Sequence, residues 1–132
     1  MTRFCIYKCV FGDYDIVVPP RHYAADTDYI VVTENPNLPT PGWQRRVVSA
    51  EGFKSPKQAN LYYRAKYHSY LGDYVASLYL DGNIHVLGNI RPLFEIFLKK
   101  DVALGLQTHP DRTSVESEIK GCIRRKKLRS SP

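Results

Sequence analysis

Asp81 and Asn83 have the residue types and the spacing of a site that holds a divalent metal ion. They stand in the stretch SLYLDGNIHV (77–86), directly after an apolar run. Their side-chain oxygens are suitable ligands for Mg²⁺ or Mn²⁺. The same residues have a second interpretation, because Asp-Gly between two apolar runs is a common signal of a β-hairpin. From these residues alone, the hairpin and the ligand site remain equally good interpretations.

A second acidic segment, FGDYD (11–15), follows the first apolar run in the same manner. Asp13 and Asp15 are placed to meet a ligand at the end of a strand. Gly and Asp are also common turn residues, so the segment alone favours a turn. Asp26 and Asp28 precede the next apolar run and resemble solvated loop charges, and for Asp26 we keep that interpretation.

The predicted helix at 56–71 places a lysine among aromatic residues. Lys66 lies three or four residues from Tyr62, Tyr63 and Tyr70, so it shares a face of the helix with them. A lysine on such a face either extends to water or meets an anion. Long side chains at an ordinary helix surface explain the same pattern, and both interpretations stay open.

His109 precedes Pro110 at the end of a further strand-like run (102–109), with Arg112 close behind. A single histidine is usually structural, but one at a strand end beside carboxylates is a candidate metal ligand. The sequence contains no G-x-x-x-x-G-K-[ST], G-x-G-x-x-G, H-E-x-x-H or G-x-S-x-G motif. These absences argue against P-loop NTPases, dinucleotide-dependent dehydrogenases, zincins and α/β-hydrolases.

The elements that must position these side chains alternate between strands and helices. Ser55 and Pro56 have the residue types of a helix start, and Gly72 those of a helix stop. Strands are predicted at 3–11, 28–34, 43–50 and 74–80, a strand or loop at 102–109, and helices at 56–71, 90–100 and 113–127. This alternation predicts an α/β fold with a mixed or mostly parallel sheet.

The net charge of +6 is located near the end of the chain. Residues 1–118 hold 13 basic and 13 acidic residues, whereas the last 14 residues hold six basic residues and no acidic one. The charge therefore indicates a basic tail and not a basic face on the body. Such a tail permits weak contact with an anionic membrane surface.

The cysteines and the hydropathy predict a cytoplasmic protein with free thiols. Cys5 and Cys9 are too far apart along a strand to form a disulfide, and no C-x-x-C occurs. No apolar run is long enough to span a membrane, and no signal peptide is evident. We therefore expect no transmembrane segment and a cytoplasmic location.

The order of these motifs resembles the domain-of-unknown-function 616 group, a glycosyltransferase-like family. This family includes plant proteins of the alkaline-ceramidase-regulating and mucilage types. The resemblance covers residues 4 to about 127 and rests on FGDYD, DYIVVTENPNL, GWQRRVV, SPKQANLYYRAKYHSYL, LDGNI and THPDRTSVESEIKGCI. It implies a single GT-A-like domain over residues 1–127, with a Rossmann-like sheet flanked by helices, and a short basic tail at 128–132.

The resemblance also implies a function. The family would transfer a sugar from a UDP- or GDP-sugar donor to a glycan or polysaccharide acceptor, with Mn²⁺ or Mg²⁺ on the donor diphosphate. In this sequence the metal ligands would be Asp81, Asn83 and His109. The nucleotide and its phosphates would contact Phe11, Gly12, Asp13, Tyr14, Asp15, Asp28, Arg64 and Lys66.

Two departures from the family pattern favour an alternative function. Asn83 stands where GT-A enzymes usually have an aspartate, and the chain ends soon after CIRRKK. Both departures suit a domain that binds a nucleotide sugar without transferring it. A third hypothesis is a nucleic-acid-binding module that uses the basic tail, and we rank it last because the body is neutral.

Overall fold

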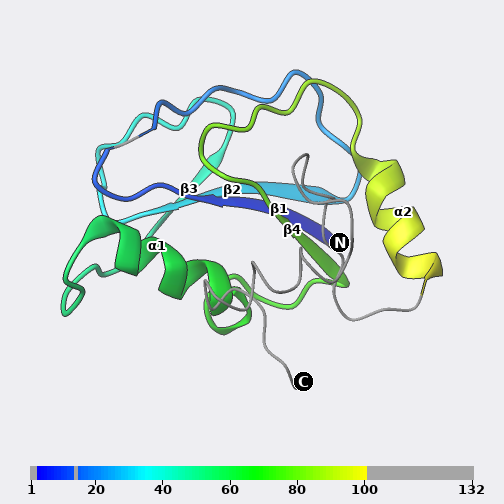
Figure 1. Cartoon of the computed structure of the whole chain (residues 1–132). Coiled ribbons are helices and arrows are strands. Elements are labelled where there is room, and N and C mark those ends of the chain that lie inside the picture. Colours follow the sequence, from blue (N-terminus) through cyan, green and yellow to red (C-terminus); the bar gives the residue numbers. More distant parts are fainter. Residues whose placement is uncertain (1–2, 14, 101–132) are drawn as a thin grey trace, which may run out of the picture.

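The computed structural model describes residues 3–13 and 15–100, which alternate between strands and helices (Figure 1). The strands in this part of the chain are β1 (Phe4–Cys9), β2 (Thr27–Thr33), β3 (Gln44–Val47) and β4 (Ala76–Tyr79). The helices in the same part are α1 (Pro56–Ala65) and α2 (Arg91–Lys99), with a 3-10 turn, η1 (Tyr67–Ser69), after α1.

The described strands form one parallel sheet in the order β3-β2-β1-β4. Phe4 of β1 lies opposite Thr27 of β2 on one side and opposite Ala76 of β4 on the other. This arrangement confirms the predicted α/β class for the described residues. Within them no strand returns along β4, so the hairpin interpretation of residues 81–83 is wrong.

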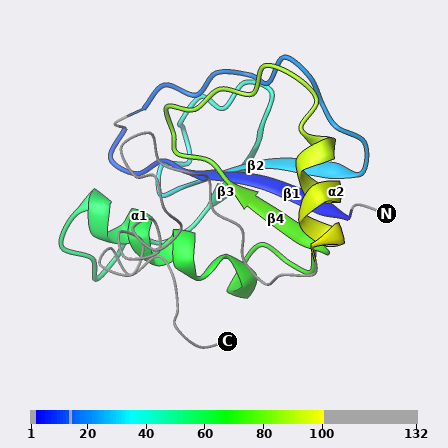
Figure 2. The same cartoon turned by 45° about the vertical axis from the view of Figure 1, so that its right-hand side comes forward.

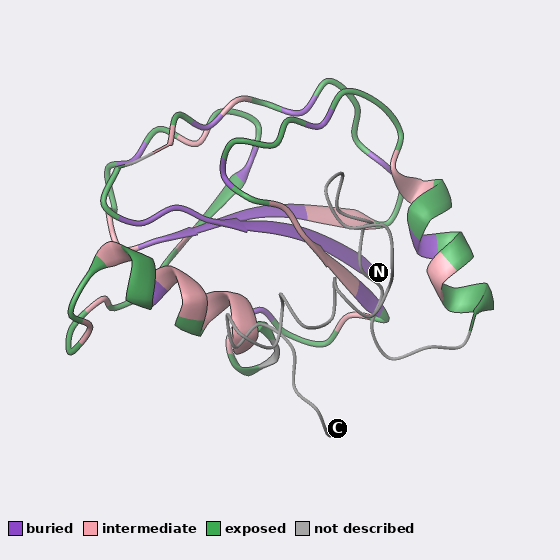
Figure 3. Cartoon of the chain, in the orientation of Figure 1, coloured by how far each residue is buried: buried purple, intermediate pink, exposed green. Residues whose placement is uncertain are grey.

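β1 is buried on both faces because its side chains alternate between two apolar layers. Phe4 belongs to one layer and Cys5 to the other, and the alternation continues along the strand. α1 covers one face of the sheet, whereas the connecting residues 15–26 and 80–90 cross the other (Figures 1 and 2). Figure 3 shows the resulting buried centre, which explains why the first two strands have nearly continuous apolar sequences.

α1 begins where it is predicted to begin and ends earlier. The backbone N–H of Gln58 donates a hydrogen bond to the Ser55 hydroxyl at 3.1 Å, and Pro56 occupies the first helical position. The α-helix ends at Ala65 and η1 continues the chain toward Gly72. Gly72 has a φ of 109°, in the left-handed region that favours glycine.

The apolar run at 74–80 indicates a well-buried strand, but β4 is less buried than β1 and β2. Ala76 is buried, but the other residues of β4 are only half-buried. In the described part of the chain β4 forms an edge of the sheet and is paired on one side alone. The short helix predicted at 90–100 is confirmed as α2, whose Phe94 ring stacks on Phe4 with ring centres 4.6 Å apart.

Several predicted features lie outside the described residues. They are the strand or loop at 102–109 with His109, the helix at 113–127 and the basic tail at 128–132. Among the residues that are described, no helix has the length and apolar character needed to cross a membrane.

Candidate functional site at the carboxyl edge of the sheet

The carboxyl ends of β1 and β4 meet where the strand order changes direction. From β1 the chain adds β2 and β3 on one side, and it then crosses to β4 on the other side. Open α/β sheets bind ligands outside the carboxyl ends of their strands at such a position. We call residues 11–13 and 15 after β1, together with the turn 81–84 after β4, the carboxyl edge.

Asp15 lies directly against the backbone of Gly82. Gly82 is buried, and a Cβ atom added to it would overlap Oδ2 of Asp15 and lie 2.8 Å from its Cγ. The N–H of Ile84 donates to the carbonyl of Asp81 at 2.9 Å and closes the turn. The missing side chain at position 82 therefore allows two loops that carry carboxylates to approach each other closely.

Lys8 fastens the turn 81–84 to the centre of the sheet. Its side chain is fully buried, and its Nζ donates hydrogen bonds to the carbonyl of Gly82 at 3.2 Å and to that of Ile84. The Nζ also lies 5.2 Å from the centre of the Trp43 ring. Burial lowers the pKa of Lys8, and the negative charge of Asp15 opposes this effect. The buried amine of Lys8 therefore holds the turn of the carboxyl edge in place through two hydrogen bonds to its backbone.

Arg64 extends from α1 to the same edge. Its Nη2 lies 3.5 Å from Oδ1 of Asp81 and donates to Oδ1 of Asn60 at 3.0 Å, and the guanidinium stands 4.4 Å from the centre of the Tyr79 ring. The Arg64 side chain is 17% exposed and that of Asp81 is 57% exposed. A guanidinium held by an amide and a ring, beside a solvated carboxylate, is suited to bind an anion such as a diphosphate.

Residues after β2 hold the loop after β1. The N–H of Gly12 donates to both carboxylate oxygens of Glu34, at 3.2 and 3.1 Å, and Nδ2 of Asn35 donates to Oδ1 of Asp13 at 3.1 Å. Gly12 and Asp13 have φ values of 71° and 57°, so they form a tight left-handed turn. The turn interpretation of this segment is confirmed, and it leaves Asp15 as the carboxylate that faces Gly82.

The structure brings together three of the residues that the sequence assigns to the site. Asp15, Asp81 and Arg64 lie at the carboxyl edge, with Gly12 and Asp13 on the same loop and Asn83 exposed in the turn. Phe11 is buried and stacks on Tyr63 with ring centres 5.4 Å apart, so its side chain belongs to the core. Tyr14 and His109 lie outside the described residues.

Asp28 and Lys66 lie away from the other predicted residues. Asp28 is opposite Cys5 near the start of β1, at the amino end of the sheet, and accepts a hydrogen bond from Tyr74 at 2.6 Å. Lys66 is the C-cap of α1. The helix runs opposite to β1, because Asn60 bonds to Cys9 and Arg64 to Tyr7, so its C-terminal end points away from the carboxyl edge.

Sequence reasoning missed the residues that brace the edge, namely Lys8, Glu34, Asn35 and Asn60. Lys8 carried a detectable signal, because a lysine inside an otherwise apolar strand must find acceptors if both faces of the strand are covered. Glu34 ends the strand predicted at 28–34 and Asn35 directly follows it, which is the same kind of position as that of Asp13 and Asp81. Asn60 carried no such signal, since its partner Cys9 is 51 residues away.

The two described cysteines are unsuited to chemistry at this edge. Cys5 and Cys9 are both buried. Both are free thiols, as the sequence predicts. Burial raises the pKa of each thiol to about 12. They therefore remain protonated at neutral pH, whereas nucleophilic and metal-binding cysteines act as thiolates.

The fit of a divalent metal to the edge depends on the donor atoms present. The described residues hold no group of three or more His, Cys, Asp or Glu side chains that could bind a metal ion by themselves. Asp15 and Asp81 lie on adjoining loops because Gly82 has no side chain. Mg²⁺ is commonly held by one or two carboxylates together with substrate phosphates and water. The residues fit this open mode and not a cage made by protein alone.

Comparison with protein-family models, curated proteins and solved structures found no match for this chain. The resemblance to the glycosyltransferase-like family therefore stays a prediction.

The contact between Gly82 and Asp15 predicts a position-specific effect of alanine. We expect Gly82→Ala to lower the melting temperature and to displace Asp15, because the new methyl group needs the space of that carboxylate. Gly88→Ala is the matched control, since nothing lies within 4 Å of a Cβ at that position. Thermal unfolding of both variants checks this, and the double variant Asp15→Ala/Gly82→Ala should recover the loss. Equal melting temperatures for Gly82→Ala and Gly88→Ala would contradict the contact.

Proposed function

We propose that this chain is a GT-A-like domain that binds a nucleotide-sugar donor at the carboxyl edge and transfers its sugar to a glycan or polysaccharide. The observation that carries the proposal is the meeting of Asp15, Asp81 and Arg64 at the switch point between β1 and β4. The parallel sheet and the resemblance in motif order support it. Asp15, Asp81 and Arg64 come from different segments of the chain. The two carboxylates would hold a divalent ion on a diphosphate, and the guanidinium would bind the phosphate oxygens.

The leaving group determines what the edge must do. Transfer of a glycosyl group releases a nucleoside diphosphate, whose increasing negative charge must be neutralised in the transition state. Arg64 would give up its contact with Asp81 and donate hydrogen bonds to the phosphate oxygens instead. Lys8 would keep the turn 81–84 in place from beneath. A divalent ion held by Asp81 and Asp15 would add further charge neutralisation when bound.

Asn83 has a lesser role in this proposal than the sequence suggests. Its side chain is exposed in the turn, and no contact ties it to Asp15 or Arg64 in the described structure. The proposal therefore assigns the metal mainly to the carboxylates of Asp15 and Asp81. Asn83 would add an amide oxygen, which is a weaker ligand than a carboxylate.

Thermal unfolding with UDP, GDP and their sugars tests this function. We expect a nucleotide diphosphate to raise the melting temperature when Mn²⁺ is present, because a ligand that binds only the folded state stabilises it by mass action. Donor turnover is then followed by release of free nucleotide diphosphate with a mixture of oligosaccharide acceptors. No shift with any nucleotide would remove the basis of the proposal.

A second candidate, a non-catalytic binder of nucleotide sugars, is favoured by the pairing of Asp81 with Arg64. This ion pair occupies both groups in the absence of ligand. The binder is separated from the enzyme by the same assay: a thermal shift without release of nucleotide diphosphate supports the binder.

A further inference from the structure

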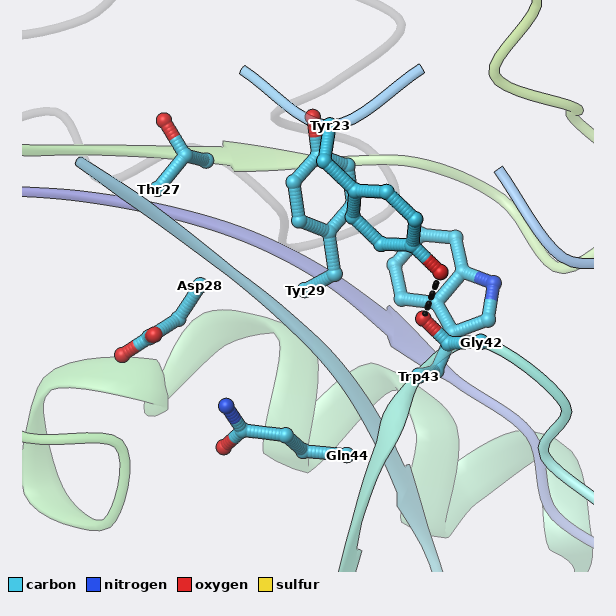
Figure 4. Close-up of a pocket in the computed structure, with 7 residues that line it drawn as sticks. All are labelled: Tyr23, Thr27, Asp28, Tyr29, Gly42, Trp43 and Gln44. Carbon is cyan, nitrogen blue, oxygen red and sulfur yellow. Dashed lines mark hydrogen bonds between the residues drawn. The ribbon is translucent and has the colours of Figure 1, made fainter. Parts of the chain in front are cut away.

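A hollow lies at the amino end of the sheet, away from the carboxyl edge. It is a notch of about 320 Å³ lined by Tyr23, Thr27, Asp28, Tyr29, Gly42, Trp43 and Gln44 (Figure 4). It forms where β3 begins opposite Ile30, so that residues 27–29 of β2 extend past the start of β3. In the described part of the chain this stretch of β2 has no neighbouring strand on that side.

The shape of the notch depends on the turn that leads into β3. Gly42 has a φ of 80°, and a Cβ at this position would lie 2.7 Å from the hydroxyl oxygen of Tyr23 and 2.8 Å from Pro19. The Tyr23 hydroxyl in turn donates to the Gly42 carbonyl at 2.7 Å. The wall formed by these two residues is therefore fixed by a close backbone approach that only glycine permits.

One side of the notch is aromatic, and its polar atoms are already engaged. Tyr23, Tyr29 and Trp43 group on one side of β2 in Figure 4, with successive ring centres 5.0 and 5.5 Å apart. The Trp43 N–H donates to the carbonyl of Val18, and the Tyr29 hydroxyl accepts from the N–H of Ala24. What these residues offer a ligand is ring surface, mainly that of Tyr23, which is 55% exposed.

The other side of the notch is polar and has unused hydrogen-bonding capacity. Asp28 uses Oδ2 to accept from Tyr74, and its Oδ1 has no partner among the described residues. The Gln44 side chain is exposed and likewise lacks a partner in the described structure. Arg46 acts electrostatically on Cys5 and Tyr74, the same two groups that Asp28 acts on. The Arg46 guanidinium therefore lies on the same face of the sheet as Asp28, where it donates to the Tyr70 carbonyl at 2.7 Å.

We propose that this notch binds a neutral sugar ring. A sugar presents an apolar C–H face and a rim of hydroxyls that both donate and accept, which matches a ring wall opposite a carboxylate oxygen and an amide. Asp28 disfavours an anion, and the neighbouring Arg46 disfavours a cation. The volume is at the lower end for ligand pockets, so it suits one or two sugar units. The inference does not depend on nucleotide binding at the carboxyl edge.

Trp43 provides the readout, because it is the only tryptophan of the chain and lines the notch. The full chain is titrated with glucose, galactose and N-acetylglucosamine while tryptophan fluorescence is followed. We expect a saturable change with at least one of them at millimolar concentration. Gln44→Ala, a surface change, should weaken that binding about tenfold through the lost hydrogen bonds. Asp28→Asn should weaken it as well.

Asp81→Asn separates this proposal from the proposed function. It alters the carboxyl edge and should leave the sugar response of Trp43 unchanged, whether or not the chain binds nucleotides. The absence of a saturable response to all three sugars would overturn the inference. So would an unchanged affinity in Gln44→Ala, or a saturable response to choline or inorganic phosphate in place of the sugars.

Discussion

Lys8→Met should destabilise the protein by about 3 kcal/mol at neutral pH, a large fraction of the stability of a typical domain. The substitution removes the donor of two hydrogen bonds, one to the buried carbonyl of Gly82 and one to the partly buried carbonyl of Ile84. Methionine has a similar shape, so lost packing contributes little. Chemical denaturation measures the effect, with Lys57→Met on the exposed surface of α1 as the control.

The pH dependence of this difference follows from the lowered pKa of Lys8. As the pH rises toward 10.5, the folded wild-type protein releases the Lys8 proton before the unfolded chain does. The unfolded state then binds more protons, so the wild-type protein gains stability relative to Lys8→Met over this range. An equal or higher stability of Lys8→Met at neutral pH would show that the cost of burying the amine outweighs its hydrogen bonds.

The second large effect is expected above pH 10, where the buried tyrosines should drive unfolding. Burial raises the pKa of Tyr7, Tyr70 and Tyr79 above the ordinary value of 10.0. These hydroxyls stay protonated in the fold while those of the unfolded chain ionise. Their contribution is therefore fully present below pH 10 and is lost as the pH rises through the raised values.

Tyrosinate absorbance and far-ultraviolet circular dichroism, followed together against pH, measure this transition. We expect ionisation of the buried tyrosines and loss of secondary structure in one cooperative step. Tyr7→Phe should reduce the number of protons released in that step by one, whereas Tyr62→Phe, at an exposed position, should leave it unchanged. Ionisation of all tyrosines near pH 10 with the fold intact would contradict the burial of these hydroxyls.

The strands are largely predictable, because they depend on local apolar runs. The continuous apolar run at 28–34 is typical of a strand covered on both faces, and Tyr29 and Ile30 of β2 lie in opposite buried layers. The placement of Asp81 at the end of a strand is predictable for the same reason. The exclusion of the hairpin could not be predicted from the sequence. It depends on the pairing of β4 with β1, which lies more than 70 residues earlier in the chain.

The bracing of the site is the part that the sequence could not supply. Lys8 reaches carbonyls 74 and 76 residues further along the chain, and its partners are backbone atoms that carry no residue-type signal. The fit of Asp15 against Gly82 likewise depends on the register of two distant strands. The family resemblance assigns Asp28 to the donor site, although Asp28 begins the strand predicted at 28–34. In the parallel register it is near the amino end.

The most direct test of the proposed function is calorimetric titration of UDP and GDP into the protein with and without Mn²⁺. Asp81→Asn is compared with Asp73→Asn, which changes an exposed aspartate outside the carboxyl edge. We predict metal-dependent binding of at least one nucleotide to the wild-type protein and to Asp73→Asn, and a loss of at least about tenfold in affinity in Asp81→Asn. Absence of binding, or equal affinity in Asp81→Asn and Asp73→Asn, would contradict a donor site at the carboxyl edge.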